Sequence, residues 1–261
     1  DISSEILKVI ERHVKEYSPF EVYSKSLYEY FQRHEPTATE WEREHSKIYQ
    51  ILASYQKEGY QSILKRLETF KGAFLCDGVG LGKTFIGLML IERFVVHEKK
   101  NVVLFVPKSG RIPVWEKNKK KYLPHIFGAY SRLEIFNHTD LMRENKEILE
   151  RLESVTERAD VVLIDEAHHF RNTGIRGKDS EERQSRYWNM FDLCKDKQVV
   201  FMTATPINNQ MIDLQHMIEL FSRLDDNYFK EAPLGIHSLT GHIRKLEKSI
   251  QSLRHIDAIQ I

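Results

Sequence analysis

The sequence predicts an α/β fold: a doubly wound, mostly parallel sheet with an N-terminal helical extension and C-terminal helices. From residue 72 onward, short apolar runs alternate with helical stretches, which is typical of a doubly wound domain. These runs are almost uniformly apolar, as expected of strands buried on both faces of a parallel sheet. Before and after this region, apolar residues recur at three- and four-residue steps, which indicates helices.

The predicted strands and helices alternate along the chain. The strands are Ala73–Cys76, Val102–Val106, Leu133–Phe136, Val161–Ile164 and Val199–Met202. The helices between them are Thr84–Val96, Val114–Tyr122, Thr139–Leu152 and Gln184–Leu193. The stretch Arg171–Arg183 contains two glycines and many charges, and it is therefore predicted to be a surface loop.

Both ends of the chain are predicted to be helical. The first 70 residues include amphipathic stretches at Val22–Phe31 and Trp41–Leu52, and we expect them to pack against the sheet domain. Near the C-terminus, an apolar stripe recurs at helical spacing over residues 239–253. We expect this helix either to pack on the core or to contact a partner in a further C-terminal part of the full-length protein. Because the chain starts with Asp1 rather than Met, we expect a fragment of a longer protein.

Composition excludes several classes of protein. Lys plus Arg is 39 and Asp plus Glu is 38, so a nucleic-acid site must rest on local patches rather than on bulk charge. Two cysteines, Cys76 and Cys194, cannot form a disulfide framework and favour a reducing, cytoplasmic compartment. The apolar runs are far shorter than the ~20 residues of a membrane helix, so we expect no membrane association.

A glycine-rich loop follows the first predicted strand and precedes a helix, which is the setting of a P-loop. Three glycines let successive backbone N–H groups point at phosphate oxygens, and the helix N-terminus adds positive potential. Lys83 is expected to bridge the β- and γ-phosphates, and the Thr84 hydroxyl to bind Mg²⁺. The alternative is a glycine-rich turn with a surface lysine. The candidate nucleotide-binding residues here are Asp77, Gly78, Val79, Gly80, Leu81, Gly82, Lys83 and Thr84.

An acidic tetrad, Asp165-Glu166-Ala167-His168, follows the fourth predicted strand. Ligand chemistry in such sheets gathers at the C-terminal ends of the strands. We expect Asp165 to hold Mg²⁺ and Glu166 to orient and deprotonate the attacking water. Lys83 and Glu166 are therefore the candidate catalytic side chains. The alternative is an acidic turn after a strand. A zinc site is not expected, because His168 and His169 are adjacent and do not share a face.

The fifth predicted strand ends in Thr203-Ala204-Thr205-Pro206. Hydroxyls at this third strand end could hydrogen-bond to the acidic tetrad and to His168. We therefore expect Thr203, Thr205 and His168 to couple the nucleotide state to the rest of the fold. The alternative is an ordinary exit from a strand into a turn.

These motifs, in this order, resemble the first RecA-like motor domain of superfamily-two helicases, and most of all the SWI/SNF-type DNA translocases of the RapA-like branch. The loop has that family's Asp-x-x-Gly-x-Gly-Lys-Thr form, and the tetrad has the letters of a DEAH box. The resemblance spans about Ser54 to Leu224. Ala167 and Ala204 stand where the family usually has glycine, two changes that the RapA-like branch tolerates.

The resemblance implies further roles. Gln56, in a glutamine motif, would read the adenine edge. Pro107, Lys108 and Ser109, with Trp115, resemble motif Ia, which lies along one DNA strand in the family. His138 and Thr139 match motif Ib more weakly. The implied domains are a helical extension (1–53), a RecA-like ATP-binding domain (54–224) and a helical segment (225–261) leading toward a second motor domain.

Sequence-independent DNA binding needs phosphate contacts from Lys, Arg and backbone N–H groups. We expect them near Pro107–Arg111, with Lys108 and Arg111 contributing charge, rather than at the lysine run Lys117–Lys121, which is equally well read as a solvated helix face.

The sequence thus favours the ATP-binding lobe of a bacterial, ATP-dependent double-stranded DNA translocase or helicase. ATP and Mg²⁺ would be its cofactors, with duplex DNA and a second RecA-like domain of the same full-length chain as partners. Without that domain's arginine, the fragment should hydrolyse ATP poorly. Two alternatives stay open: a motor subunit of a restriction-type system, and a non-hydrolysing nucleotide-dependent switch or binding module.

Overall fold

The structure is a computed structural model that describes residues 39–78, 80–126, 131–177, 184–207, 210–231 and 233–259, with side chains as far as residue 250. The helix predicted at Val22–Phe31 lies outside the described residues, as does most of the predicted N-terminal extension. All the described residues belong to one compact unit.

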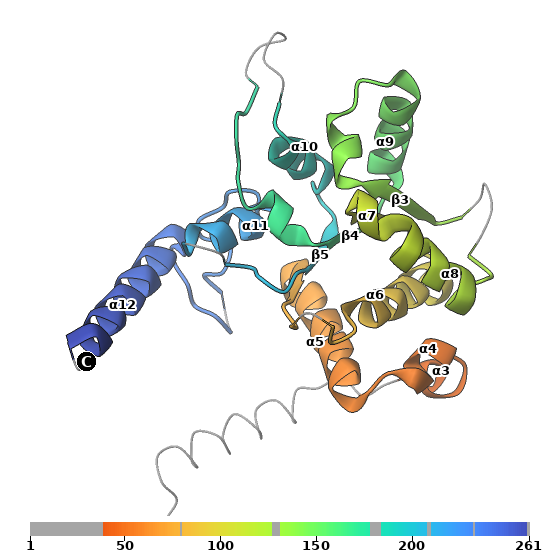
Figure 1. Ribbon diagram of the computed structural model, residues 1–261, viewed down its shortest axis with the longest axis horizontal. Coiled ribbons are helices and arrows are strands. Elements are labelled where there is room, and N and C mark those ends of the chain that lie inside the picture. Colours follow the sequence, from red (N-terminus) through yellow and green to blue (C-terminus); the bar gives the residue numbers. More distant parts are fainter. Residues whose placement is uncertain are drawn as a thin grey trace, which may run out of the picture. The chain divides into compact units, whose positions relative to one another are not determined.

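The described residues form a five-stranded sheet in which every neighbouring pair of strands is parallel, in the order β1-β5-β4-β2-β3. The strands are β1 (Gly72–Leu75), β2 (Val102–Val106), β3 (Leu133–Asn137), β4 (Val161–Asp165) and β5 (Gln198–Met202). The predicted α/β fold is confirmed, and each predicted strand lies within one residue of an observed one. Figure 1 shows the helices that surround this sheet.

Helices precede, connect and follow the strands. Those before and between the first strands are α3 (Glu40–Glu44), α4 (Lys47–Ile51), α5 (Ser54–Phe70), α6 (Lys83–Ile91) with its π-helical continuation η1 (Glu92–His97), α7 (Lys108–Gly110), π-helical η2 (Arg111–Glu116) and α8 (Lys117–Tyr122). Those later in the chain are the 3₁₀ helix η3 (His138–Met142), α9 (Lys146–Arg158), the 3₁₀ helix η4 (Ala167–Phe170), α10 (Arg186–Leu193), α11 (Ile212–Ser222) and α12 (Leu239–Ile259).

Two predicted helices are wrong in detail. The stretch Trp41–Leu52 is two short helices, because the Ser46 side chain accepts the backbone N–H of Tyr49 and starts a new helix. The stretch Thr139–Leu152 is also divided, because Asn145 accepts the N–H groups of Glu147 and Ile148 and begins α9 there. Side chains of this type compete locally with a continuous helix.

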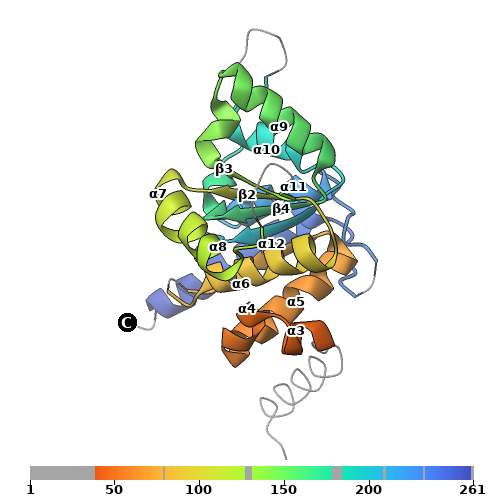
Figure 2. The ribbon, with the colours of Figure 1, turned by 90° about the vertical axis from the view of Figure 1, so that its right-hand side faces the viewer.

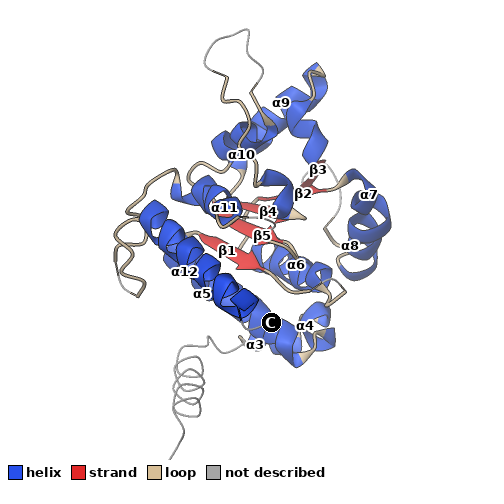
Figure 3. Cartoon of the chain, turned by 60° about the vertical axis from the view of Figure 1, so that its left-hand side comes forward, coloured by secondary structure: helices blue, strands red, loops and turns tan. Residues whose placement is uncertain are grey.

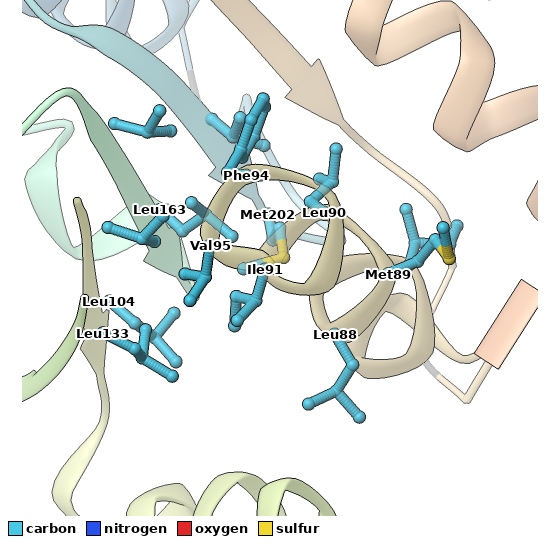
Figure 4. Packing of buried hydrophobic residues seen from close by; sticks show 14 of the residues in the cluster. Leu88, Met89, Leu90, Ile91, Phe94, Val95, Leu104, Leu133, Leu163 and Met202 are labelled. Atoms are coloured by element: carbon cyan, nitrogen blue, oxygen red, sulfur yellow. The ribbon is translucent and has the colours of Figure 1, made fainter. Parts of the chain in front are cut away.

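The sheet separates two apolar cores, since side chains of a strand alternate between its faces. On one face, Leu104 and Met202 pack against α6 and η1, with α4, α5 and α8 in the same core. On the other face, Phe105 and Phe201 pack against α9, α10 and α11. Figures 2 and 3 show the strands between these two helical layers. In Figure 4, Ile91 and Val95 lie close to Met202, Leu163 and Leu104, whereas Leu88 and Met89 point away from these strand residues.

The predicted C-terminal stripe packs only at its beginning. Leu239 and Ile243 are buried in the second core, whereas Leu246 and Ile250 are 39% and 40% exposed. Figure 1 shows α12 running away from the sheet toward the C-terminus. Across the described ranges, no helix has the length and apolar character needed to cross a bilayer.

Candidate nucleotide-binding site

A pocket of about 420 Å³ lies where the loop after β1 meets the ends of β2 and β4. Its lining contains Lys83 and Thr84 from the glycine-rich loop and Asp165 and Glu166 from the acidic tetrad. The full lining is Gly80, Gly82, Lys83, Thr84, Phe85, Pro107, Ser109, Gly110, Val114, Asn118, Asp165 and Glu166. The glycine-rich loop and the acidic tetrad, separated by some 80 residues in the sequence, therefore face one cavity.

The loop after β1 has the backbone that its glycines permit. Gly80 and Gly82 have φ of +82° and +80°, a left-handed conformation that other residues rarely adopt. The Lys83 ammonium donates hydrogen bonds to the carbonyl oxygens of Asp77 (2.8 Å) and Gly78 (3.0 Å). These contacts hold the cation beside the pocket, at the start of α6. Val79 lies outside the described residues.

Tyr55 and Gln56 of α5 brace the same loop. The Tyr55 hydroxyl and the Gln56 amide each donate to the carbonyl of Leu81 at 3.1 Å. The Gln56 Oε1 accepts the N–H of Ala53 at 2.9 Å, so the amide also caps its own helix. A Cβ on Gly82 would lie 2.3 Å from Gln56 Nε2, so this contact requires glycine. The role of Gln56 in reading adenine stays a prediction, and its observed partner is the phosphate-loop backbone.

Asp165 ends β4 with both carboxylate oxygens engaged. The Trp115 indole N–H donates to Oδ2 at 2.7 Å, and the Glu166 backbone N–H donates to Oδ1 at 3.0 Å. Burial raises the pKa of this carboxyl, and the hydrogen bond from Trp115 opposes that rise. A carboxylate has about four lone-pair sites, so each oxygen can still accept one further partner from the pocket.

Glu166 and His168 connect the acidic tetrad to β5. Glu166 has a φ of +49°, a strained conformation for a non-glycine residue and one that clusters at functional sites. The Nδ1 of His168 lies 3.1 Å from Glu166 Oε2 and 3.2 Å from the buried Thr203 hydroxyl. Thr205 is arranged differently, with an exposed side chain and a backbone N–H that donates to Thr203 Oγ1. The chain of contacts therefore runs through Thr203, while the coupling role stays a prediction.

The residues expected to contact nucleic acid lie beside the same pocket. Pro107 and Ser109 line it, and Lys108 is exposed on the short helix α7. Arg111 donates to the Glu116 carboxylate at 2.8 Å. The segment that contains Pro107 and Ser109 therefore lines the same pocket as the glycine-rich loop and the acidic tetrad.

His138 and Thr139, the other two residues expected to contact nucleic acid, differ in their exposure to solvent. His138 is only 3% exposed and packs against the rings of His169 and Phe170, so it is an internal residue in this conformation. Burial lowers its pKa to about 4, which keeps the ring neutral near pH 7. Thr139 is exposed, so a surface contact at this strand end falls to Thr139 rather than to His138.

The donor set of the pocket suits magnesium. Asp165 and Thr84 offer a carboxylate and a hydroxyl, and Mg²⁺ prefers oxygen ligands and is bound by one or two carboxylates together with phosphates and waters. Within the described part of the chain, no group of three or more His, Cys, Asp or Glu side chains is arranged to hold a metal. The two oxygen donors of Asp165 and Thr84 fit a magnesium ion whose other ligands are phosphate oxygens and waters.

Sequence reasoning missed several features of this site. The motif that contains Trp115 does not reveal this residue as the partner of Asp165, because the two residues are 50 positions apart. The hydrogen bond from the Tyr55 hydroxyl to the Leu81 carbonyl could not be predicted for the same reason, because the two residues are 26 positions apart. One signal could have indicated the contact of Trp115. A buried indole N–H usually finds a hydrogen-bond acceptor, and the expected metal site offers a carboxylate.

Comparison with known proteins gives a family and two relatives. The family model described as "Type III restriction enzyme, res subunit" matches residues 50–208. An uncharacterized ATP-dependent helicase of Bacillus subtilis, YqhH, is 26% identical over 173 residues, covering 64% of this chain and 28% of that protein. The probable ATP-dependent DNA helicase CHR12 of Arabidopsis thaliana is 24% identical over 189 residues, covering 64% and 16%. The chain thus spans less than a third of these relatives.

Among solved structures, the SWI2/SNF2 ATPase core of Sulfolobus solfataricus in complex with dsDNA matches with a TM-score of 0.48 and 21% identity. That match covers 65% of this chain and 35% of the other.

Proposed function

Since the chain belongs to the family described as "Type III restriction enzyme, res subunit", we propose that it is the ATP-binding lobe of an ATP-dependent motor that moves along duplex DNA. One observation supports this most: a single pocket is lined by Lys83, Thr84, Asp165 and Glu166. A phosphate-binding loop, a hydroxyl, a metal-binding carboxylate and a neighbouring acid are the parts that ATP hydrolysis requires. The curated relatives are named as ATP-dependent helicases.

In this proposal each side chain has a distinct task. The backbone N–H groups of the glycine-rich loop and the Lys83 ammonium bind the phosphates and neutralise the charge that develops on them. Thr84 and Asp165 would hold Mg²⁺, which would supply positive charge to the phosphate oxygens when bound. Glu166 orients the attacking water and takes its proton.

Contacts to nucleic acid would come from the segment Pro107–Arg111. Lys108 supplies an exposed charge there, and the N–H groups of α7 lie beside it. Phosphate contacts of this kind carry no sequence information, which suits movement along DNA. An arginine from a second RecA-like domain would complete the site, a contribution of roughly a thousandfold or more.

The test is ATP hydrolysis by the protein that contains this chain, measured with and without duplex DNA. We expect hydrolysis to rise with DNA and to fall about 100-fold or more in Lys83→Ala, because a donor to the developing charge is lost. Lys146→Ala is the matched control, since Lys146 is an exposed lysine on α9 that carries only a weak surface pair with Glu150. DNA-stimulated hydrolysis that survives in Lys83→Ala would refute the proposal.

The description of the matched family favours a second candidate, the motor subunit of a restriction-type system. It uses the same site, and a nuclease domain elsewhere in the full-length chain would distinguish it. A nucleotide-dependent switch would instead bind ATP without DNA-stimulated turnover, so the hydrolysis assay separates it from both motors.

A further inference from the structure

Trp115 is almost completely buried, with 1% of its surface exposed, yet its one polar atom reaches the edge of the nucleotide pocket. Its indole N–H donates to Asp165 Oδ2 at 2.7 Å. The ring itself is in the first core, packed with α6 and β5. The residue therefore connects the interior of the domain to the carboxylate at the end of β4.

The packing around the indole ring leaves it little freedom. A Cβ on Gly87 of α6 would lie 2.6 Å from the indole Cη2, so the helix approaches the ring as closely as glycine allows. The backbone of η2 fixes the other end of the side chain. An indole held on both sides presents its N–H in one direction, and the carboxylate that accepts this bond is fixed with it.

The direction of that bond matters for the pocket. Asp165 Oδ1 is already bound to the Glu166 backbone N–H at 3.0 Å, so the two hydrogen bonds hold both oxygens of the carboxylate. Rotation about the side chain would break at least one of them. Asp165 and Thr84 line the same cavity, so the lone pairs that remain belong to a carboxylate held in place at that cavity.

We propose that Trp115 is a positioning residue that orients the Asp165 carboxylate for its metal. The inference rests on the proposed function in one respect, that Asp165 binds the metal of a nucleotide complex. It adds that the metal site is built partly by η2, the helix that directly follows Lys108–Gly110. Partners of metal ligands commonly change metal affinity 10- to 100-fold when they are removed.

The experiment compares Trp115→Phe with the wild-type chain. Phenylalanine keeps an aromatic ring in the core and removes the N–H donor. ADP binding is titrated first without a divalent cation and then at increasing MgCl₂. We expect metal-free ADP affinity to stay within about twofold and the half-saturating Mg²⁺ concentration to rise about tenfold.

The matched control is Trp188→Phe. Trp188 lies on α10 in the opposite helical layer, and its buried Nε1 has no hydrogen-bond partner among the described residues. This variant makes the same change of side chain far from Asp165, and its Mg²⁺ dependence should match the wild type.

Three results would overturn the inference. An unchanged Mg²⁺ dependence in Trp115→Phe would show that the N–H does not orient the carboxylate. An equal loss of metal-free and Mg²⁺-dependent binding would reduce Trp115 to a packing residue. Failure of the wild-type chain to bind ADP at all would refute the proposed function itself, and this inference with it.

A measurement on the wild-type chain covers the case in which Trp115→Phe does not fold. The indole N–H resonances of Trp41, Trp115 and Trp188 are assigned by elimination with Trp41→Phe and Trp188→Phe. Adding MgCl₂ to the ADP complex should then shift the Trp115 resonance, and ADP alone should shift it much less. A Trp115 resonance that does not respond to Mg²⁺ would contradict the proposal.

Discussion

Two clusters of polar side chains in this domain contain similar residue types, but we expect one to support folding and the other to bind a ligand. The first, here the Glu42 cluster, joins Glu42, Tyr60, Gln61 and Arg93. Glu42 is 1% exposed and accepts hydrogen bonds from all three of the others. The second, here the Asp165 cluster, joins Trp115, Asp165, Glu166, His168 and Thr203 at the ends of the strands.

The clusters differ in how their charges are balanced. In the Glu42 cluster the carboxylate meets a guanidinium, and Arg93 also pairs with Glu98 at 2.7 Å. In the Asp165 cluster two acids are adjacent, and both line a cavity that Lys83 also lines. A buried carboxylate whose partners are all internal holds helices together. A carboxylate with lone pairs directed at a cavity is suited to a ligand. Folding should therefore depend on the first cluster and ligand binding on the second.

The largest effect is expected from breaking the Glu42 cluster. Glu42→Ala leaves the buried Tyr60 hydroxyl without its acceptor and removes one of the two carboxylates that pair with Arg93, so the free energy of unfolding should fall by about 3 kcal/mol. Urea denaturation measures this change. Glu44→Ala on the same helix is the control, because Glu44 is exposed, and it should have little effect. Equal stability of the two variants would contradict a structural role for the cluster.

The second prediction reverses charge beside the pocket rather than inside the fold. In a Lys108→Glu and Arg111→Glu double variant, duplex DNA affinity should fall, and the slope of log K against log salt should become shallower by about 2, for two lost phosphate contacts. Thermal stability should change little, because the Arg111–Glu116 pair is on the surface. Lys146→Glu on α9 is the control. An unchanged affinity and slope would remove this segment from the DNA-binding surface.

The smallest effect is expected at Glu92, where a buried negative charge opposes folding. Glu92, on η1, accepts a hydrogen bond from Ser46, and burial raises the pKa of its carboxyl. A raised pKa in the folded state means that the protonated form stabilises the fold at low pH, and that this stability is lost as pH rises through the folded pKa.

Glu92→Gln should therefore raise the melting temperature by about 2 °C at pH 8, and the gain should disappear at pH 4. Exposed Glu58, changed to Gln, is the control at both values. A gain that is equal at pH 4 and pH 8 would exclude ionisation of Glu92 as its cause.

Much of this organisation could be predicted from the sequence. The apolar strands are found within a residue of their predicted positions because burial on both faces leaves an unbroken apolar run. The glycine-rich loop and the acidic tetrad could be located because glycine spacing and strand ends are local features. The resemblance to superfamily-two motor domains is confirmed by the family match over residues 50–208.

What could not be predicted depends on contacts between distant segments or on local capping. The Trp115–Asp165 bond needs the path of α7 and η2, which nothing in the spacing reveals. The burial of His138 follows from packing against His169 and Phe170 of a different element. The helix breaks at Ser46 and Asn145 arise from single side-chain hydrogen bonds that the apolar periodicity does not record.

The central claim is that Lys83 and Asp165 act on one nucleotide. A crystal structure of this chain with Mg²⁺ and a non-hydrolysable ATP analogue tests it most directly. We expect the terminal phosphates to lie about 3 Å from the Lys83 ammonium, with the metal between those phosphates, Thr84 and the Asp165 carboxylate. An analogue that binds elsewhere on the domain, or a metal without contact to Asp165, would contradict it.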